Sequence, residues 1–302
     1  MERNVIRPRF LFIGFILSKE LLMKVSHKAV VGLLLAFFFA LASATFAMAQ
    51  DSGEERPVNR HDMEEIISRG ELRVAITAVD QAPFYFVDKS GNLAGYDIDL
   101  AHKMADELGV KLVISREAAT FNDLVPLVSS GKADLAISKL SRTLTRSKFV
   151  KFSTPYMTFR QGILFNRLQL AKVASEDSVN QFVRNYVGTM GVIAKSSYAN
   201  YAKENFPNAT LMEYPTWEAA VDALTRGEVL SVYRDELELK KVLSSVPNSA
   251  LLFKPIYFRD LTDPLAIAVK SSNTQLLFWV NIFLESQPKM TADQILEKYA
   301  NK

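Results

Sequence analysis

Hydrophobic residues recur with a helical period in Gly95–Leu108, whose sequence is GYDIDLAHKMADEL. The apolar positions of this stretch are Ile98, Ala101, Met104, Ala105 and Leu108. They fall on one side of a helix, so the pattern predicts an amphipathic helix with one buried face. Asp97 is the expected N-cap, and Gly109 is the expected residue that ends the helix.

Short apolar runs rich in β-branched residues flank this helix and predict buried strands. The runs are Leu72–Thr77, Lys111–Ser115 and Asp134–Ser138. A further helix is predicted over Thr120–Gly131, because Thr120 and Asp123 have the spacing of a capping box and a glycine ends the segment. Strands that alternate with helices indicate right-handed parallel units, and therefore an α/β fold.

The helix–strand pattern occurs twice. Phe121–Lys139 and Trp217–Asp235 align at a constant offset of 96 residues, and Gly131 corresponds to Gly227. In each segment a helical pattern is followed by a glycine and by a strand that ends in polar residues. Two such units predict two lobes whose strand ends face one cleft.

The C-terminal part predicts two further strands and two closing helices. The strands are Leu251–Phe253 and Leu265–Lys270, and the helices are Asn273–Gln287 and Thr291–Tyr299. The apolar faces of the helices are expected in the core. These faces include Phe278, Ile282, Ile295 and Tyr299.

The N-terminal region has the pattern of a secretory signal. Met23 begins a basic segment, an apolar run Ala29–Leu41 follows, and Ala47–Ala49 (AMA) fits a cleavage site. A membrane anchor is the alternative, but the apolar run is short and no basic cluster follows it. We therefore expect residues 1–49 to be a start extension plus a cleaved signal peptide, with a mature protein in a periplasm. The apolar run in residues 1–22 is likewise too short to span a bilayer.

Composition excludes several classes of protein. The chain has 302 residues, of which 49% are hydrophobic and 23% charged, as in ordinary globular proteins. The first 49 residues hold six of the 36 Lys and Arg and two of the 33 Asp and Glu, so the remainder carries a formal charge of −1. This balance gives no reason to expect nucleic acid as a partner. The absence of cysteine excludes disulfides, thiol nucleophiles and a lipid-bearing cysteine.

No motif for catalysis, a cofactor or a metal is found. The sequence has no Walker loop, no Gly-x-Gly-x-x-Gly and no His-Glu-x-x-His. His61 and His102 are the only histidines after residue 49, and neither lies in a convincing metal or catalytic pattern. We therefore expect a protein that is not an enzyme and needs no cofactor.

Gly95–Leu100 (GYDIDL) and the helix after it resemble the signature of the family 3 bacterial solute-binding proteins, which are periplasmic receptors for amino acids and related solutes that serve ABC importers. The resemblance implies an α/β, two-lobed periplasmic-binding-protein fold of type II, with a discontinuous first lobe and two hinge crossings. Residues 50–69 would then be a lead-in. Lobe 1 would comprise 70–160 and 265–302, and lobe 2 would comprise 161–264.

The same resemblance implies the ligand-binding residues. Ser138, Ser141 and Arg146 match the family's first-lobe loop, where the arginine holds the α-carboxylate of the ligand through paired charge-assisted hydrogen bonds. In the second lobe, Ser196 and Ser197 match a hydroxyl pair at the start of a helix.

Two further positions complete the implied site. Asp235 stands where the family carries the acid that pairs with a ligand α-ammonium. Phe121 corresponds to an aromatic wall against the ligand side chain, or it is a core residue at a helix start. Asp97 and Asp99 belong to the scaffold in the family and are not expected to touch the ligand.

Two lysines depart from the family pattern. Lys139 stands where relatives often have serine, and Lys195 replaces the usual glycine. Their added positive charge predicts an acidic amino acid or a dicarboxylate as the ligand. Alternatively, both lysines reach solvent at the cleft rim and only steer ligands.

The function implied by the resemblance is reversible binding of a small amino-acid-like solute by a monomer, which delivers it to an inner-membrane ABC permease. One alternative is an exported enzyme similar to the cyclohexadienyl or arogenate dehydratases, which share this fold and need a general acid in the cleft. Asp80, Glu117 and Asp235 are the acids near the expected site. Another alternative is a sensor or enzyme-associated binding module, against which we count the lack of any extension beyond Lys302.

Overall fold

The first of two mixed sheets in the computed structural model has five strands in the order β4-β1-β5-β12-β6. Its strands are β1 (Glu71–Thr77), β4 (Lys111–Ala118), β5 (Leu135–Ala136), β6 (Val150–Phe152) and β12 (Ala268–Lys270). Strand β1 pairs in parallel with β4 and β5, whereas β12 pairs antiparallel with β5 and β6. The structure describes residues 61–175 and 178–299. Because β12 comes from the C-terminal part of the chain, the first lobe is discontinuous in sequence.

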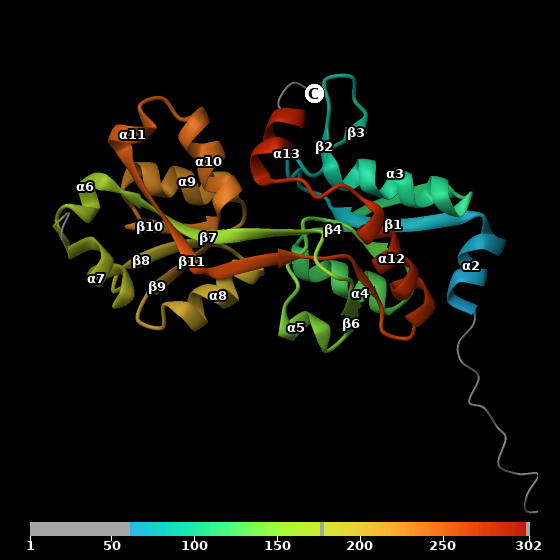
Figure 1. The fold of residues 1–302 in the computed structure, drawn as a ribbon. Helices are drawn as coiled ribbons and strands as arrows, with labels where there is room; N and C mark the ends of the chain where they lie inside the picture. Colours follow the sequence, from blue (N-terminus) through green and yellow to red (C-terminus); the bar gives the residue numbers. More distant parts are fainter. Residues whose placement is uncertain (1–60, 176–177, 300–302) are drawn as a thin grey trace, which may run out of the picture. The chain divides into compact units, whose positions relative to one another are not determined.

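Helices cover both faces of the first sheet. In Figure 1, α3 lies on one side of β1 and α4 on the other. The helices of this lobe are α2 (His61–Arg69), α3 (Tyr96–Leu108), the short 3-10 helix η1 (Phe121–Asp123), α4 (Leu124–Ser129), α5 (Leu144–Ser147), α12 (Thr274–Ser286) and α13 (Ala292–Tyr299). A small hairpin of β2 (Phe86–Val87) and β3 (Leu93–Ala94) precedes α3.

The second sheet has the order β11-β7-β10-β8-β9. Its strands are β7 (Met157–Asn166), β8 (Thr189–Ile193), β9 (Thr210–Tyr214), β10 (Ser231–Asp235) and β11 (Phe253–Leu265). The helices of the second lobe are α6 (Arg167–Leu170), α7 (Val179–Arg184), α8 (Ser197–Asn205), α9 (Trp217–Arg226), α10 (Glu236–Ser245) and α11 (Ser249–Leu252). Strands β8, β9 and β10 are parallel to one another, while β7 is antiparallel to β10.

Two long strands connect the lobes. Strand β7 follows the first-lobe strand β6, and β11 precedes β12. The two strands pair antiparallel, from Phe253 with Asn166 to Leu265 with Met157, and they run side by side in Figure 1. The fold therefore agrees with the expected two-lobed architecture with two crossings. Both lobes lie within one compact unit, to which all of the described residues belong.

The signature helix starts earlier than predicted. Its N-cap is Gly95, not Asp97, and Gly109 ends it in a left-handed conformation as expected. Gly95 has φ 126°, and a Cβ there would collide with the carbonyl oxygen of Phe84. Asp97 lies within the first turn of the helix, and its buried carboxylate accepts a hydrogen bond from a distant loop, the N–H of Lys139.

Two predictions in the C-terminal part are wrong. Residues 251 and 252 belong to helix α11, and the strand begins only at Phe253. On α12, Phe278 is 67% exposed and Ile282 50% exposed, although both were expected in the core. Helix α12 is apolar on more than one face, and its buried face is formed by Leu276, Val280, Phe283 and Leu284. Ile295 and Tyr299 of α13 are buried as predicted.

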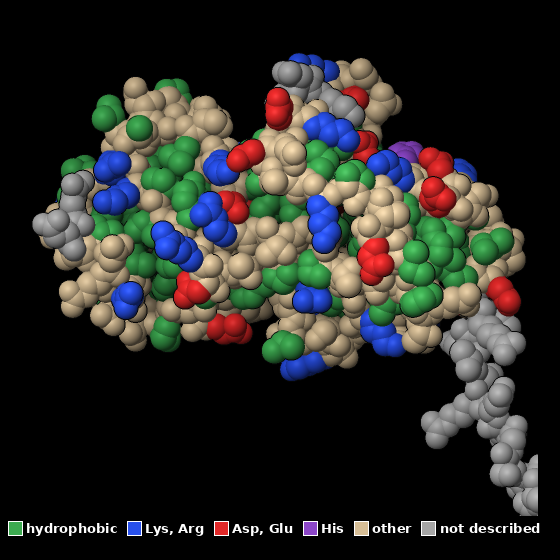
Figure 2. All heavy atoms as spheres, viewed as in Figure 1, with side chains coloured by type: hydrophobic (Ala, Val, Ile, Leu, Met, Phe, Trp, Pro, Cys, Tyr) green, Lys and Arg blue, Asp and Glu red, His purple; other side chains and the backbone are tan. Residues whose placement is uncertain are grey.

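The signal peptide predicted for residues 23–49 lies outside the described residues. Within residues 61–175 and 178–299, no helix is long and apolar enough to cross a membrane. On the face of the molecule shown in Figure 2, basic and acidic side chains are interspersed and form no large patch of one sign.

Candidate ligand-binding site

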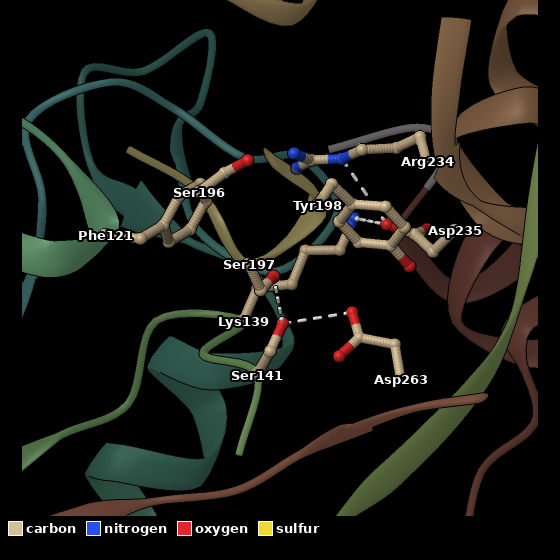
Figure 3. A pocket seen from close by; sticks show the side chains of 9 residues that line it. All are labelled: Phe121, Lys139, Ser141, Ser196, Ser197, Tyr198, Arg234, Asp235 and Asp263. Atoms are coloured by element: carbon tan, nitrogen blue, oxygen red, sulfur yellow. Dashed lines mark hydrogen bonds and ion pairs between the residues drawn. The ribbon is translucent and has the colours of Figure 1, made fainter. Parts of the chain in front are cut away.

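Side chains from both lobes and from a connecting strand meet in one pocket (Figure 3). Its lining residues are Phe121, Lys139, Ser141, Ser196, Ser197, Tyr198, Arg234, Asp235 and Asp263. The space left among them is about 10 Å³, which is close to the minimum for one water molecule. The pocket lies after β5 in one lobe and after β8 and β10 in the other, where open α/β sheets bind ligands.

A chain of hydrogen bonds joins the two lobes on one side of the pocket. The hydroxyl oxygens of Ser141 and Ser197 are 2.8 Å apart, and the Ser141 hydroxyl donates to the Asp263 carboxylate at 3.0 Å (Figure 3). Burial raises the pKa of Asp263 to about 6, although the bond from Ser141 opposes this shift. These contacts bring two predicted binding residues together with an acid that the sequence did not indicate.

A buried ion pair joins the lobes on another side. The Lys139 ammonium lies 3.0 Å from Asp235 Oδ2 and 2.7 Å from Glu238 Oε1. Asp235 also caps α10 by accepting the N–H of Glu238. Burial alone would raise the pKa of Glu238, but Lys139 and Lys241 hold it well below its usual range. Lys139 therefore faces the second lobe and is not at a solvated rim.

The signature helix positions Lys139 through Asp97. The Asp97 carboxylate accepts the Lys139 backbone N–H at 2.6 Å, and both side chains are buried. Lys139 has φ 47°, a left-handed conformation that non-glycine residues rarely adopt. Burial raises the pKa of Asp97 to about 7. The GYDIDL signature thus supports the backbone of the loop that contains Lys139, which agrees with its expected role as scaffold.

Arg234 places a second cation in the pocket. Its guanidinium carbon lies 5.8 Å from the ring centre of Phe121, 5.6 Å from that of Tyr198 and 5.9 Å from that of Trp217. Its Nε is 3.5 Å from Asp235 Oδ2, and its Nη2 donates to Gln81 at 3.2 Å. Aromatic rings favour contact with a planar guanidinium group, so these three rings stabilise the Arg234 side chain in this position.

The second-lobe loop in which Lys195 replaces the glycine usual in the family keeps a left-handed backbone. Lys195 has φ 54°, and its side chain is exposed. Ser196 is the N-cap of α8, since its hydroxyl accepts the N–H of Ala199. The replacement of glycine by lysine therefore leaves the loop in the left-handed conformation that glycine favours. Lys195 does not line the pocket, whereas Ser196 and Ser197 do.

Ser138 and Arg146 do not line the pocket either. The Ser138 hydroxyl is fully buried and accepts the N–H of Thr77 at the end of β1. Arg146 donates to the carbonyl oxygen of Ser141 and to Asn122 Oδ1, and burial lowers its pKa to about 10. The role of Arg146 as a carboxylate anchor stays a prediction.

Sequence reasoning did not select Tyr198, Arg234, Glu238 and Asp263. Arg234 and Glu238 flank the selected Asp235, so the strand-end pattern contained a signal for them. Asp263 lies on the return crossing, and no short motif distinguishes it from the other acids of the sequence. Within residues 61–175 and 178–299, no group of three or more His, Asp or Glu side chains could hold a metal ion.

This geometry is that of a two-lobed binding protein of type II, in which both lobes contribute to one site. The family model of the bacterial extracellular solute-binding proteins, family 3, matches residues 72–302, and the chain belongs to that family. The resemblance seen in the signature helix is thereby confirmed.

Relatives within this family include transport proteins and an enzyme. The chain is 24% identical over 205 residues to the ABC transporter arginine-binding protein 1 of Escherichia coli K12, which covers 66% of this chain and 78% of that protein. It is 35% identical over 207 residues to the cyclohexadienyl dehydratase of Pseudomonas aeruginosa, which covers 68% of this chain and 70% of the enzyme.

Solved structures show the same fold. An ancestral amino-acid-binding protein, described as a precursor of cyclohexadienyl dehydratase, is 31% identical with a TM-score of 0.63. The match covers 78% of this chain and 98% of that one. A binding component of an ABC transporter from Wolinella succinogenes, complexed with lysine, is 27% identical with a TM-score of 0.64, over 76% of this chain and 96% of that one.

Proposed function

We propose that this protein binds a small amino-acid-like solute between its lobes and delivers it to an ABC-type permease of the inner membrane. The observation that carries the proposal is the meeting of polar side chains from both lobes in one pocket, above all Ser141 with Ser197 and Lys139 with Asp235. The family membership and the transport relatives support it.

Closure of the lobes around the solute supplies the mechanism. A ligand that touches both lobes is bound fully only in the closed state, so it shifts the balance between open and closed forms by its differential affinity. The hinge is formed by the paired strands β7 and β11. A permease that recognises the closed form would then distinguish the loaded protein from the empty one.

The location and the assembly state belong to the same proposal. We infer a mature, monomeric periplasmic protein that starts at Gln50 or within about two residues of it, because the AMA site follows an apolar run. Mass spectrometry of the exported protein tests the cleavage, and light scattering tests the assembly state. Retention of residues 23–49 would contradict the periplasmic assignment.

A thermal-shift screen of residues 50–302 against amino acids, dicarboxylates and polyamines tests the binding function. A ligand at about a hundred times its dissociation constant stabilises the folded state by roughly 2.7 kcal/mol, which is a measurable shift. Calorimetry then gives the affinity. If none of these three classes and no monocarboxylate raises the melting temperature, the proposed function is wrong.

Two arginines compete for the role of carboxylate anchor. Arg146 is the residue implied by the family resemblance, while Arg234 lines the pocket. Replacing the true anchor by alanine should weaken binding by ~3 kcal/mol, since a buried carboxylate loses its counter-charge. Calorimetry on Arg146→Ala and Arg234→Ala, with circular dichroism to confirm folding, assigns the role. Affinity for the solute unchanged in both variants would exclude both residues.

A dehydratase activity is the second candidate function, because the 35% identical relative is a cyclohexadienyl dehydratase. The pocket contains Asp235 and Asp263 as acids, and burial raises the pKa of Asp263 to about 6, which suits proton transfer near neutral pH. Incubation with prephenate and detection of phenylpyruvate test this reading. Asp263→Asn is the matched variant, because it removes the proton donor and preserves the shape of the side chain.

A further inference from the structure

Asp235, the acid that the family resemblance assigns to a ligand ammonium, already holds an ammonium group of the protein. The Lys139 side chain is 2% exposed, and its Nζ lies between Asp235 and Glu238 at 3.0 and 2.7 Å. The rings of Phe84 and Phe159 lie 5.4 and 5.9 Å from the same nitrogen. Two carboxylates and two aromatic faces thus surround the lysine ammonium as they would surround a bound cation.

The backbone holds this arrangement in place. Lys139 lies in a left-handed turn with φ 47°, and the Asp97 carboxylate accepts its N–H at 2.6 Å. The turn directs the side chain toward Asp235, as Figure 3 shows. The lysine ammonium is therefore positioned by the first lobe to reach the acid of the second lobe.

A ligand ammonium cannot share this position. A second cation beside Asp235 would lie within a few ångströms of the Lys139 ammonium, and like charges at that distance repel strongly where water is excluded. If Lys139 moved away instead, its buried charge would lose both carboxylate partners, which is unfavourable. The usual ammonium site is thus occupied by a group that the ligand would have to displace.

Donors for an anion remain available in the same pocket. The Arg234 side chain is 3% exposed, its Nε lies 3.5 Å from Asp235 Oδ2 without a hydrogen bond, and its Nη2 donates to Gln81. Arginine has five N–H donors, which match the oxygens of a carboxylate. Phe121 and Tyr198, which also line the pocket, lie against the guanidinium and offer apolar surface to the rest of a ligand.

We propose that the cleft selects carboxylates that carry no α-ammonium, such as 2-oxo acids, because Lys139 itself supplies the ammonium that pairs with Asp235. This proposal rests on the proposed binding function and specifies its ligand class. Lys139 is the specificity-determining residue, and Arg234 is the group that receives the carboxylate.

The test compares amino acids with their 2-oxo acid counterparts by calorimetry on residues 50–302. The pairs are L-glutamate with 2-oxoglutarate, L-phenylalanine with phenylpyruvate, and L-leucine with 4-methyl-2-oxopentanoate. We expect the wild-type protein to bind at least one 2-oxo acid about tenfold or more tightly than the matched amino acid. In Lys139→Ser, which frees Asp235, the preference within that pair should shift toward the amino acid by about tenfold.

Lys195→Gly is the matched control. It removes one positive charge from a nearby loop, but that lysine is exposed and does not line the pocket, so the preference should stay unchanged. Tighter wild-type binding of the amino acid in every pair that binds would overturn the ligand class and leave the binding function intact. This ranking needs no variant, so it decides the proposal even if Lys139→Ser does not fold. Failure of both ligand classes to bind the wild-type protein would overturn the proposal, and the thermal-shift screen then judges the binding function separately.

Discussion

Two helix–strand units resemble each other in sequence, Phe121–Lys139 and Trp217–Asp235. They reach the pocket from opposite lobes and place different side chains there. Each has a threonine before its helix and a glycine after it, and the glycines adopt left-handed conformations with φ 79° at Gly131 and 73° at Gly227. In the first unit a six-residue helix follows a 3-10 turn, whereas α9 in the second has ten residues.

The strand ends differ more than the helices. Strand β10 stays paired with β7 through Asp235, which then caps α10. Strand β5 has only two residues, and the chain turns away at Lys139. One unit therefore holds a carboxylate rigidly at the end of a strand, while the other extends a lysine from a loop. Similar sequence patterns thus provide opposite charges for one contact between the lobes.

Removal of the Lys139 ammonium should have the largest effect on this contact. Lys139→Met leaves the buried carboxylates of Asp235 and Glu238 without their shared cation, so we expect a loss of ~4 kcal/mol in the free energy of unfolding. Urea denaturation near pH 7 measures it. Addition of Asp235→Asn should recover part of the loss. A loss below ~1 kcal/mol would show that the ion pair does not stabilise the protein.

Asp97, which holds the loop of the first unit, should make stability depend on pH. Its carboxyl pKa is raised by burial to about 7, so the folded state favours the neutral form. This group's contribution is fully present below about pH 4 and is lost as the pH rises through about 7, by up to ~4 kcal/mol. In Asp97→Asn the decline between about pH 4 and pH 8 should be shallower. Parallel pH profiles of wild type and variant would contradict the expected ionisation.

Alanine substitutions at Gly131 and Gly227 compare how much the two helix ends contribute to stability. Both Gly131→Ala and Gly227→Ala force alanine into a left-handed conformation, so each should lower the free energy of unfolding by ~1–2 kcal/mol. The loss at Gly227 should be slightly larger, because a Cβ would lie 2.9 Å from Gln169 Nε2, while at Gly131 the nearest atom is 3.6 Å away. Thermal denaturation of both variants checks the order.

The threonines before the helices should show the smallest effects. The Thr216 hydroxyl accepts the N–H of Ala219, so Thr216→Ala should cost ~1 kcal/mol. In the first unit Asp123 accepts the backbone N–H of Thr120, a bond that Thr120→Ala retains, so the cost should be nearer ~0.5 kcal/mol. Urea denaturation of the two variants compares them. An equal or larger loss of stability in Thr120→Ala would mean that the Thr120 hydroxyl is the main capping group of the first helix.

Local sequence patterns were sufficient for several of the elements but not for all of their boundaries. The periodicity of residues 95–108 predicted a helix, and Gly109 ends it as expected, yet Asp97 serves a distant backbone group and not the helix N-terminus. Phe278 and Ile282 fit a buried helix face by type and are exposed. Periodicity locates an apolar stripe, but only the neighbouring elements decide which stripe is covered.

The sequence by itself determined the family, the two-lobed α/β fold, the left-handed glycines and several residues that meet in the pocket, among them Ser141, Ser197 and Asp235. The glycines at the helix ends follow from turn chemistry, whereas the family, the two lobes and the binding residues follow from the resemblance to a known family that begins with the signature motif. Only the tertiary structure decided that Lys139 pairs with Asp235, that Arg234 and Asp263 line the pocket, and that Arg146 and Lys195 do not. The physical reason is that charge pairing and burial depend on which strand ends lie together in space, across separations that no local pattern encodes.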